Sequence, residues 1–259
     1  LPQIGHTATS RLNAGVGITG MATTMARKGL DYNCPAGLEE IHRIAERHAY
    51  YVIKASLRLG KELGNAPWID KTKWPEGWLP IDTYARSIDQ IVEPKYRYDW
   101  DALRKDIIRN GGIRNSSLIA HMPVESSSKA SGAPNGVYPI RDLTLKKTDL
   151  KNTIDWCATD SDILGDQYQR AWALSTEDLC KVYGVIQKFT DQSISADFYE
   201  DRFKYPILQS SRLIQDFLYM PKYGIKAKYY QNSLTSVDVK LGDLAPNDKA
   251  DCGSGGCTL

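Results

Sequence analysis

The 259-residue sequence lacks long apolar runs, has few cysteines and carries little net charge. No stretch approaches the roughly 20 apolar residues that cross a bilayer, and no signal peptide leads the chain, so we expect no membrane partner. A net charge of +2 gives no reason to expect direct binding of nucleic acid. Five cysteines without a framework of spacings fit a reducing cytoplasm better than secretion.

Potential metal ligands are also sparse. The chain has four histidines, His6, His42, His48 and His121. His42 and His48 are six residues apart on one predicted helix, so they do not share a face, and no histidine pair has a ligand spacing. Cys34, Cys157 and Cys180 show no second paired spacing that would complete a zinc site. We therefore expect neither a metal nor a cofactor to be bound by this chain.

Helices are predicted first in the N-terminal half. Apolar residues recur at three- and four-residue spacing from Leu38 to Leu57, which predicts a long amphipathic helix ending near Gly64. Asp99 is a predicted N-cap for a short helix over residues 100–109. Prolines and tryptophans recur across residues 66–98. Because the prolines interrupt regular structure, we expect this stretch to form a packed loop.

Two more helices are predicted in the C-terminal half. Ser175 and Asp178 have the spacing of a capping box, and a helix is expected to follow them. The last helix is predicted from about Ile207 to Tyr219. Its inward-facing residues are expected to be Leu208, Leu213, Phe217 and Leu218.

Single short strands are predicted between the helices, at residues 117–122 and 225–230. Alternation of helices with single strands indicates a parallel α/β sheet or barrel. After Asn232 the sequence becomes polar and unpatterned, which predicts a flexible arm.

A glycine-rich segment has the spacing of a dinucleotide-binding fingerprint. Gly15, Gly17 and Gly20 match that spacing, and Glu39 or Glu40 lies at about the right distance to hold a ribose. The residues before the glycines, however, do not form the buried strand that such a fingerprint must follow. We favour close helix packing through small residues over nucleotide binding.

Hydroxyl side chains follow the strand predicted at residues 117–122. The sequence 122–128, MPVESSS, places small hydroxyl residues at a turn, where hydroxyls and backbone N–H groups can hold phosphate oxygens. A serine-rich loop that only caps the next element is the ordinary alternative.

Two adjacent tyrosines, Tyr229 and Tyr230, end the last predicted strand. Because neighbouring residues of a strand point to opposite faces, we expect one ring in the core and the other at a cavity or partner. Packing in the core and at its rim is the ordinary role of such a pair.

Two cysteines stand near the C-terminus. Cys252 and Cys257 enclose only glycine and serine, which permits a small disulfide that opens and closes at little strain. Such a short loop adds little stability, so a redox shuttle fits better than a structural disulfide. Metal binding and idle surface thiols are the alternatives.

Six segments and one cysteine pair form a specific set when they are taken in sequence order. They are 114–118, 122–127, 135–136, 187–195, 224–226, 229–232 and the Cys252/Cys257 pair. The set resembles the C-terminal part of the large (α) subunit of class I ribonucleotide reductase. The resemblance runs nearly from end to end. It implies half of a ten-stranded α/β barrel over residues 1–232 and a redox-active tail over residues 233–259.

The resemblance also implies roles for individual residues. Pro123, Val124, Glu125, Ser126 and Ser127 correspond to the loop that holds the substrate diphosphate, with Val124 where many members carry serine. The substrate class would be ribonucleoside diphosphates, which the family reduces to deoxyribonucleotides.

A radical and a reductant are implied as well. Tyr229 and Tyr230 correspond to a relay that carries an electron and a proton from the small subunit's radical to an active-site cysteine. The chain would depend on the metal and tyrosyl-radical cofactor of that small subunit. Cys252 and Cys257 correspond to the dithiol that reduces the active-site disulfide and is reset by thioredoxin or glutaredoxin.

Other parts of the family pattern are not recognisable in this sequence. These are the radical-bearing cysteine flanked by Asn and Glu, the pair of substrate-reducing cysteines and the effector sites. The sequence also begins with Leu1 rather than methionine. We expect one piece of a split large subunit, similar to those of some bacteriophages, working in the host cytosol with an N-terminal chain that carries the missing cysteines.

Two functions of other classes are open alternatives. A free-standing dithiol redox protein would exchange thiols in isolation but would not need the tyrosine pair. A non-enzymatic docking module, binding another protein through its acidic arm, would tolerate loss of both tail cysteines.

Overall fold

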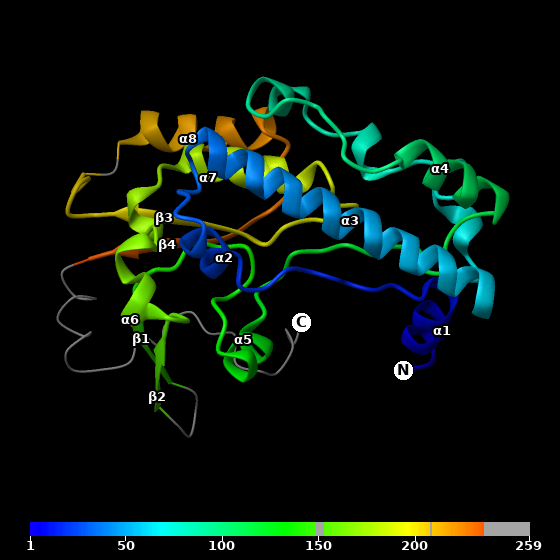
Figure 1. The fold of residues 1–259 in the computed structure, drawn as a ribbon, viewed down its shortest axis with the longest axis horizontal. Coiled ribbons are helices and arrows are strands. Elements are labelled where there is room, and N and C mark those ends of the chain that lie inside the picture. Colours follow the sequence, from blue (N-terminus) through cyan, green and yellow to red (C-terminus); the bar gives the residue numbers. More distant parts are fainter. Residues whose placement is uncertain (149–152, 208, 236–259) are drawn as a thin grey trace.

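The computed structural model describes residues 1–148, 153–207 and 209–235. Its longest element is α3 (Pro35–Leu63), a helix of 29 residues that runs across the molecule (Figure 1). The predicted end is confirmed, because Gly64 is the C-cap with a φ of 82°. The other helices are α1 (Pro2–Arg11), α2 (Met21–Arg27), α4 (Trp100–Arg109), α5 (Glu125–Ser131), α6 (Ser161–Leu164), α7 (Thr176–Gln187) and α8 (Ser210–Lys222). The strands are β1 (Thr144–Thr148), β2 (Thr153–Cys157), β3 (Ala196–Asp201) and β4 (Lys228–Leu234).

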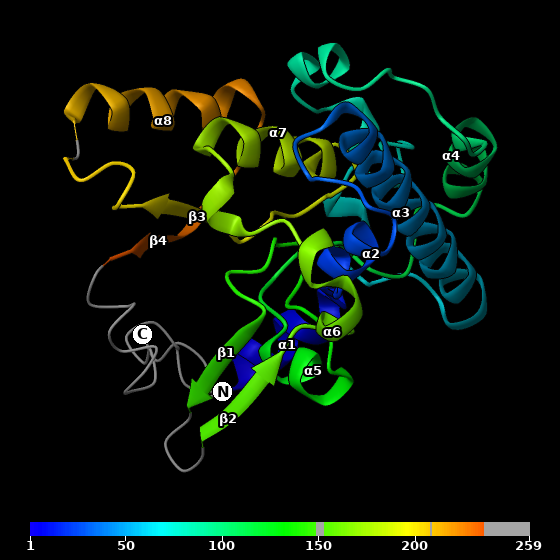
Figure 2. The same ribbon diagram turned by 60° about the vertical axis from the view of Figure 1, so that its left-hand side comes forward.

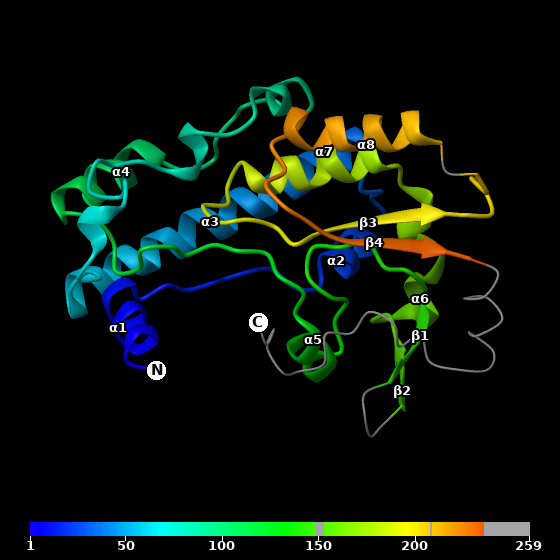
Figure 3. The same cartoon turned by 180° about the vertical axis from the view of Figure 1, so that it is seen from behind.

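Extended segments lie side by side as an open parallel arrangement. β3 pairs in parallel with β4, and isolated parallel bridges join Val16 to Ile119 and His121 to Ile194. The order is therefore 14–16, 118–121, 193–201 and 228–234, with helices in the connections (Figure 3). Part of an α/β barrel is confirmed, with no closed sheet within the described residues.

Side chains of one turn hold the first three segments together. The Asp191 carboxylate accepts hydrogen bonds from the backbone N–H groups of Leu118 and Ile119, at 2.9 and 2.6 Å. The Gln192 amide donates to the Ala14 carbonyl at 2.7 Å. These side chains take the place of ladder partners, which explains why the strand predicted at residues 117–122 forms only bridges.

Helix α7 lies at the centre of the packing and contacts α3, α8 and β3. Its predicted capping box is confirmed: the Ser175 hydroxyl accepts from the Asp178 N–H, and the Asp178 carboxylate accepts from the Ser175 N–H. Its apolar side chains are fully buried, including Leu179, Val182 and Ile186. Among the described helices, none is long and apolar enough to cross a membrane.

The inward face predicted for the last helix is wrong. None of the residues of α8 is buried, and Ile214, Phe217 and Leu218 are 62%, 58% and 63% exposed. Leu213 is also exposed, at 37%, and Leu208 lies outside the described residues. Figure 2 shows α8 along the outside of the molecule. An amphipathic pattern indicates an apolar face but does not tell whether the same chain covers it.

The remaining sequence predictions are confirmed in part. Residues 66–98 form a packed loop with three short 3₁₀ turns, and the Trp74 indole N–H donates to the Ser116 carbonyl at 3.1 Å. β4 begins three residues later than the predicted strand, because Gly224 and Ile225 still close the end of α8. The antiparallel hairpin β1–β2, which projects from the body in Figure 2, was not predicted.

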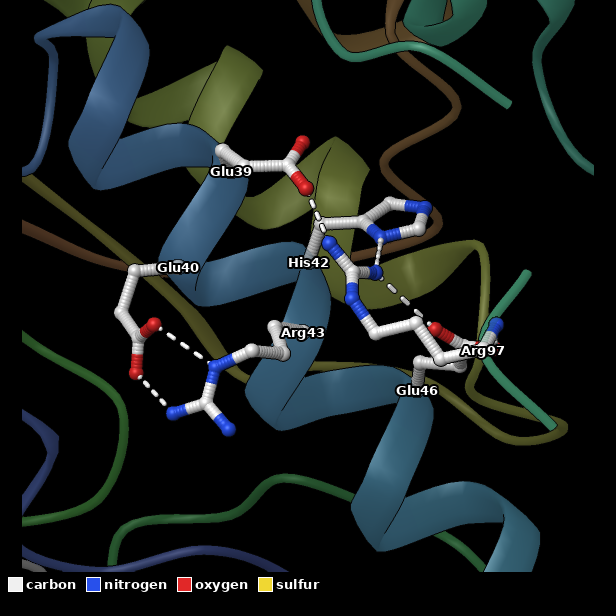
Figure 4. Close-up of polar contacts among 6 residues, drawn as sticks. All are labelled: Glu39, Glu40, His42, Arg43, Glu46 and Arg97. Carbon is white, nitrogen blue, oxygen red and sulfur yellow. Dashed lines mark hydrogen bonds and ion pairs between the residues drawn. The ribbon is translucent and has the colours of Figure 1, made fainter. Parts of the chain in front are cut away.

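A buried polar network fixes α3 to the chain that precedes α4 (Figure 4). Glu46 is fully buried, and its carboxylate accepts from the Arg97 backbone N–H at 2.6 Å and from the Trp100 indole at 3.2 Å. The Arg97 guanidinium bonds Glu46, Glu39 and His42 Nδ1. Burial, with the nearby Lys188 and Arg97 charges, lowers the pKa of His42 to about 3, so this imidazole is neutral.

We expect Glu46→Ala to lower the free energy of unfolding by about 2–3 kcal/mol, because it leaves a buried indole and a partly buried guanidinium without their acceptor. Glu39→Ala is the matched control, since it removes the half-exposed carboxylate of the same arginine and should cost less than about 1 kcal/mol. Urea unfolding of both variants measures the difference. Equal losses would contradict the structural role given to Glu46.

Candidate functional site

The segment of residues 123–127, called the serine loop here, lies directly after the second extended segment, and Glu125, Ser126 and Ser127 already form the first turn of α5. Val124 is the N-cap residue of this helix, and its backbone N–H donates to the Asn135 side-chain oxygen at 2.7 Å. The Asn135 amide in turn donates to the Glu125 carboxylate at 2.5 Å. Asn135 thus holds Val124 and Glu125, the two residues at which α5 begins. Its role was not predicted, although the sequence pattern included residues 135–136.

The hydroxyl groups of this loop have different environments. Ser126 and Ser127 are exposed, whereas Ser128 is buried and donates to the Glu125 carbonyl at 2.9 Å. Pro123 is half-buried beside them. The capping alternative is wrong for this helix, because its N-cap is Val124, no side chain caps it, and Ser128 lies inside α5. A phosphate-binding role for residues 123–127 stays a prediction.

The tyrosine pair lies side by side on β4. The ring centroids of Tyr229 and Tyr230 are 4.2 Å apart, and their hydroxyl oxygens are 3.5 Å apart. Tyr229 is 45% exposed. The expectation that the two rings point to opposite faces of the sheet is therefore wrong.

A bulge explains this arrangement. Residues 196 and 198 of β3 pair with residues 228 and 231 of β4, so one β3 residue, Asp197, stands opposite both Tyr229 and Tyr230. Two residues that face one partner leave the strict alternation of a strand, which allows adjacent side chains to lie together. The sequence pattern of alternating faces does not reveal such a bulge.

Tyr138 is buried close to the start of β3. Its hydroxyl donates to the Ser195 carbonyl at 2.7 Å, immediately before β3. Burial chiefly raises its pKa, and the charge of Asp197 adds to the rise. Tyr138 thus holds the chain at the start of β3, the strand that pairs with the strand of Tyr229 and Tyr230.

The glycine-rich segment has a packing role here. A Cβ atom on Gly17 would lie 2.7 Å from the Ala120 carbonyl oxygen, so glycine allows two extended segments to approach closely. The small residues thus pack strand against strand, rather than helix against helix as expected. Glu39 and Glu40 are engaged in ion pairs with Arg97 and with Arg43.

The described cysteines do not approach one another. Cys34, Cys157 and Cys180 are free thiols, and burial raises the pKa of Cys180 to about 12. Cys252 and Cys257 lie outside the described residues. In the part of the chain that the structure describes, no three potential metal ligands come together.

These features define a class of protein: a partial parallel α/β barrel with a serine loop after its second extended segment and a pair of adjacent phenols on its last strand. A family model described as "Ribonucleotide reductase, barrel domain" matches residues 1–231. The chain belongs to this ribonucleotide reductase family.

Individual relatives agree with the family assignment. The chain is 36% identical to ribonucleoside-diphosphate reductase 1 subunit alpha of Salmonella typhimurium and 35% identical to that of Escherichia coli K12. Both comparisons cover 100% of this chain and 34% of the relative. The alpha subunit of Enterobacteria phage T4 is 38% identical over 87% of this chain and 30% of its own length. The chain thus spans about a third of the relatives it matches.

Proposed function

We propose that this chain is a working part of a ribonucleoside-diphosphate reductase, which reduces ribonucleotides to deoxyribonucleotides for DNA synthesis. The match of residues 1–231 to the barrel-domain family carries the proposal. The relatives named above as alpha subunits of that enzyme support it. We infer that it acts in the cytoplasm.

Substrate binding is assigned to the loop of residues 123–127. Exposed Ser126 and Ser127 offer hydroxyl groups to a diphosphate, and the bonds from Asn135 hold the beginning of the loop in place. A fixed loop that offers hydrogen-bond donors loses little entropy when it binds an anion.

Radical transfer is assigned to Tyr229 and Tyr230. A phenol can give up an electron together with its hydroxyl proton, and the partner must lie close to receive them. Hydroxyl oxygens 3.5 Å apart support a relay between the two rings. The radical would come from the small subunit and its metal cofactor.

Assembly with other chains completes the proposed enzyme. Within the described residues, β4 pairs only with β3, and residues 14–16 pair only with the segment at 118–121, so both edges of the sheet are open. Open edges and the exposed apolar face of α8 are surfaces that favour association. We assign the missing active-site cysteines to an N-terminal large-subunit polypeptide.

Re-reduction of the active site is assigned to Cys252 and Cys257, with thioredoxin or glutaredoxin as the external reductant. We expect Cys252→Ser or Cys257→Ser to abolish multiple turnover driven by thioredoxin in the assembled enzyme. Reduction by a small dithiol should stay near normal, because such a reductant enters the pocket unaided. Steady-state deoxyribonucleotide formation with each reductant measures the effect.

Cys157→Ser is the matched control for this experiment, because it removes an exposed thiol outside the proposed shuttle. Equal loss with both reductants would argue against a shuttle. Absence of ribonucleotide reduction by the unsubstituted assembly, with either reductant, would instead contradict the proposed function.

A further inference from the structure

A carboxyl group beside the tyrosine pair has no part in the function proposed above. Asp197 is the single β3 residue opposite Tyr229 and Tyr230. The Tyr230 backbone N–H donates a hydrogen bond to the Asp197 carboxylate. The Asp197 Oδ1 atom is buried and has no hydrogen-bond partner among the described residues. The backbone here is fixed, because the Tyr183 hydroxyl donates to the Asp197 carbonyl at 2.7 Å.

This hydrogen bond satisfies a backbone N–H group at the bulge. A bulge leaves a backbone group of the longer strand without its regular ladder partner, and an unpaired buried N–H costs free energy. The Asp197 side chain supplies an acceptor for the Tyr230 N–H. An ionised acceptor forms a shorter and stronger bond than a neutral one.

We propose that Asp197 is a positioning residue of the tyrosine relay, whose carboxyl group holds the β4 bulge and keeps the phenols of Tyr229 and Tyr230 side by side. The inference rests on the proposed relay function of the two tyrosines. It deepens that function, because it makes the geometry of the relay depend on the protonation state of one carboxyl group.

The charges around Asp197 are consistent with such dependence. Burial raises its pKa to about 7, against the lowering by Arg141 and by the Tyr230 N–H, while Glu125 of the serine loop raises it. The carboxyl is therefore ionised above about pH 7 and neutral below it. The charge-assisted bond to Tyr230 is present in the ionised form and weakens as the pH falls.

Phenols from three elements also face this carboxyl. Burial chiefly raises the pKa of Tyr138, of Tyr199 on β3 and of Tyr183 on α7, and the Asp197 charge adds to each rise. These three phenols stay protonated near neutral pH. Asp197 is thus the group in this cluster whose pKa lies near 7.

The Tyr230 amide reports directly on this bond. We would label the full chain with [¹⁵N]tyrosine, which gives signals from its 15 tyrosines, and assign Tyr230 by its loss in Tyr230→Phe. We expect the Tyr230 N–H signal to shift with a midpoint near pH 7. The shift should vanish in Asp197→Asn, which keeps an oxygen acceptor but cannot ionise, and Asp197→Ala should exchange this amide proton at least about tenfold faster.

Activity of the assembled enzyme gives the second readout. Asp197→Asn should remove a step near pH 7 from the pH profile of kcat, and Asp197→Ala should lower kcat about tenfold or more with KM unchanged. Asp201→Asn is the matched control: this β3 carboxylate also accepts backbone N–H groups, but from the turn at residues 203–204. It should leave the Tyr230 signal and the kcat profile unchanged.

The outcomes distinguish a failure of the positioning role of Asp197 from a failure of the proposed reductase function. A Tyr230 amide that does not titrate, or that exchanges equally in Asp197→Ala and the unsubstituted chain, overturns the inference. A titrating amide with an unchanged kcat profile in Asp197→Asn also overturns it, because the bond would then have no influence on the relay. Failure of the unsubstituted assembly to reduce ribonucleotides contradicts the proposed function, whereas the amide signal still reports whether Asp197 holds the bulge.

Discussion

Tyr229→Phe and Tyr230→Phe are each expected to reduce ribonucleotide reduction by at least about a hundredfold with every reductant, the scale on which loss of an essential proton-transferring group acts. Phenylalanine keeps the ring and its packing but lacks the hydroxyl that is oxidised with loss of a proton. Substrate affinity should be unchanged, because the serine loop is untouched. Turnover and nucleotide binding of each variant are the measurements.

Tyr51→Phe is the control, since Tyr51 is an exposed tyrosine on α3 away from the pair. It should keep full activity. A Tyr229 or Tyr230 variant that retained most of its activity would show that the pair serves packing alone. Circular dichroism shows whether a variant that loses activity has also lost its fold. We expect it to stay folded, because removal of one phenolic hydroxyl should cost only about 1 kcal/mol of stability.

Local signals predicted four of the eight described helices, α3, α4, α7 and α8, but not α1, α2, α5 and α6. The cap at Asp99, the capping box of Ser175 and the stripe beginning at Leu38 all depend on residues within a few positions of one another. Backbone N–H groups at a helix start need such nearby partners, so the sequence around them contains the information. The order of helices and extended segments then indicated a parallel α/β arrangement.

Features that depend on distant partners could not be predicted from the residues alone. The close approach of the Tyr229 and Tyr230 rings arises from a register shift between two strands, and no local pattern marks that shift. Asn135 bonds Val124 and Glu125 across ten or eleven positions, from beyond the C-terminal end of α5 back to its start. The outward face of α8 depends on what else packs on that helix.

Reconstitution carries the largest expected effect of all, because activity should change from none to measurable turnover. A parallel sheet with two open edges lacks the strands that close a barrel, and the described residues contain no group of active-site cysteines. Alone, the chain should bind a hydrophobic dye or aggregate. An N-terminal large-subunit polypeptide should cover its edges through an apolar interface above about 2,000 Å².

The decisive measurement is deoxyribonucleotide formation by the chain alone, by the chain with the small subunit, and by the chain with both the small subunit and the N-terminal large-subunit polypeptide. We expect turnover only in the third mixture, with the two large-subunit pieces eluting as one complex. Ribonucleotide reduction by the chain with the small subunit alone, or a soluble monomer that binds no hydrophobic dye and no N-terminal polypeptide, would contradict the claim that this chain works as one piece of a shared barrel.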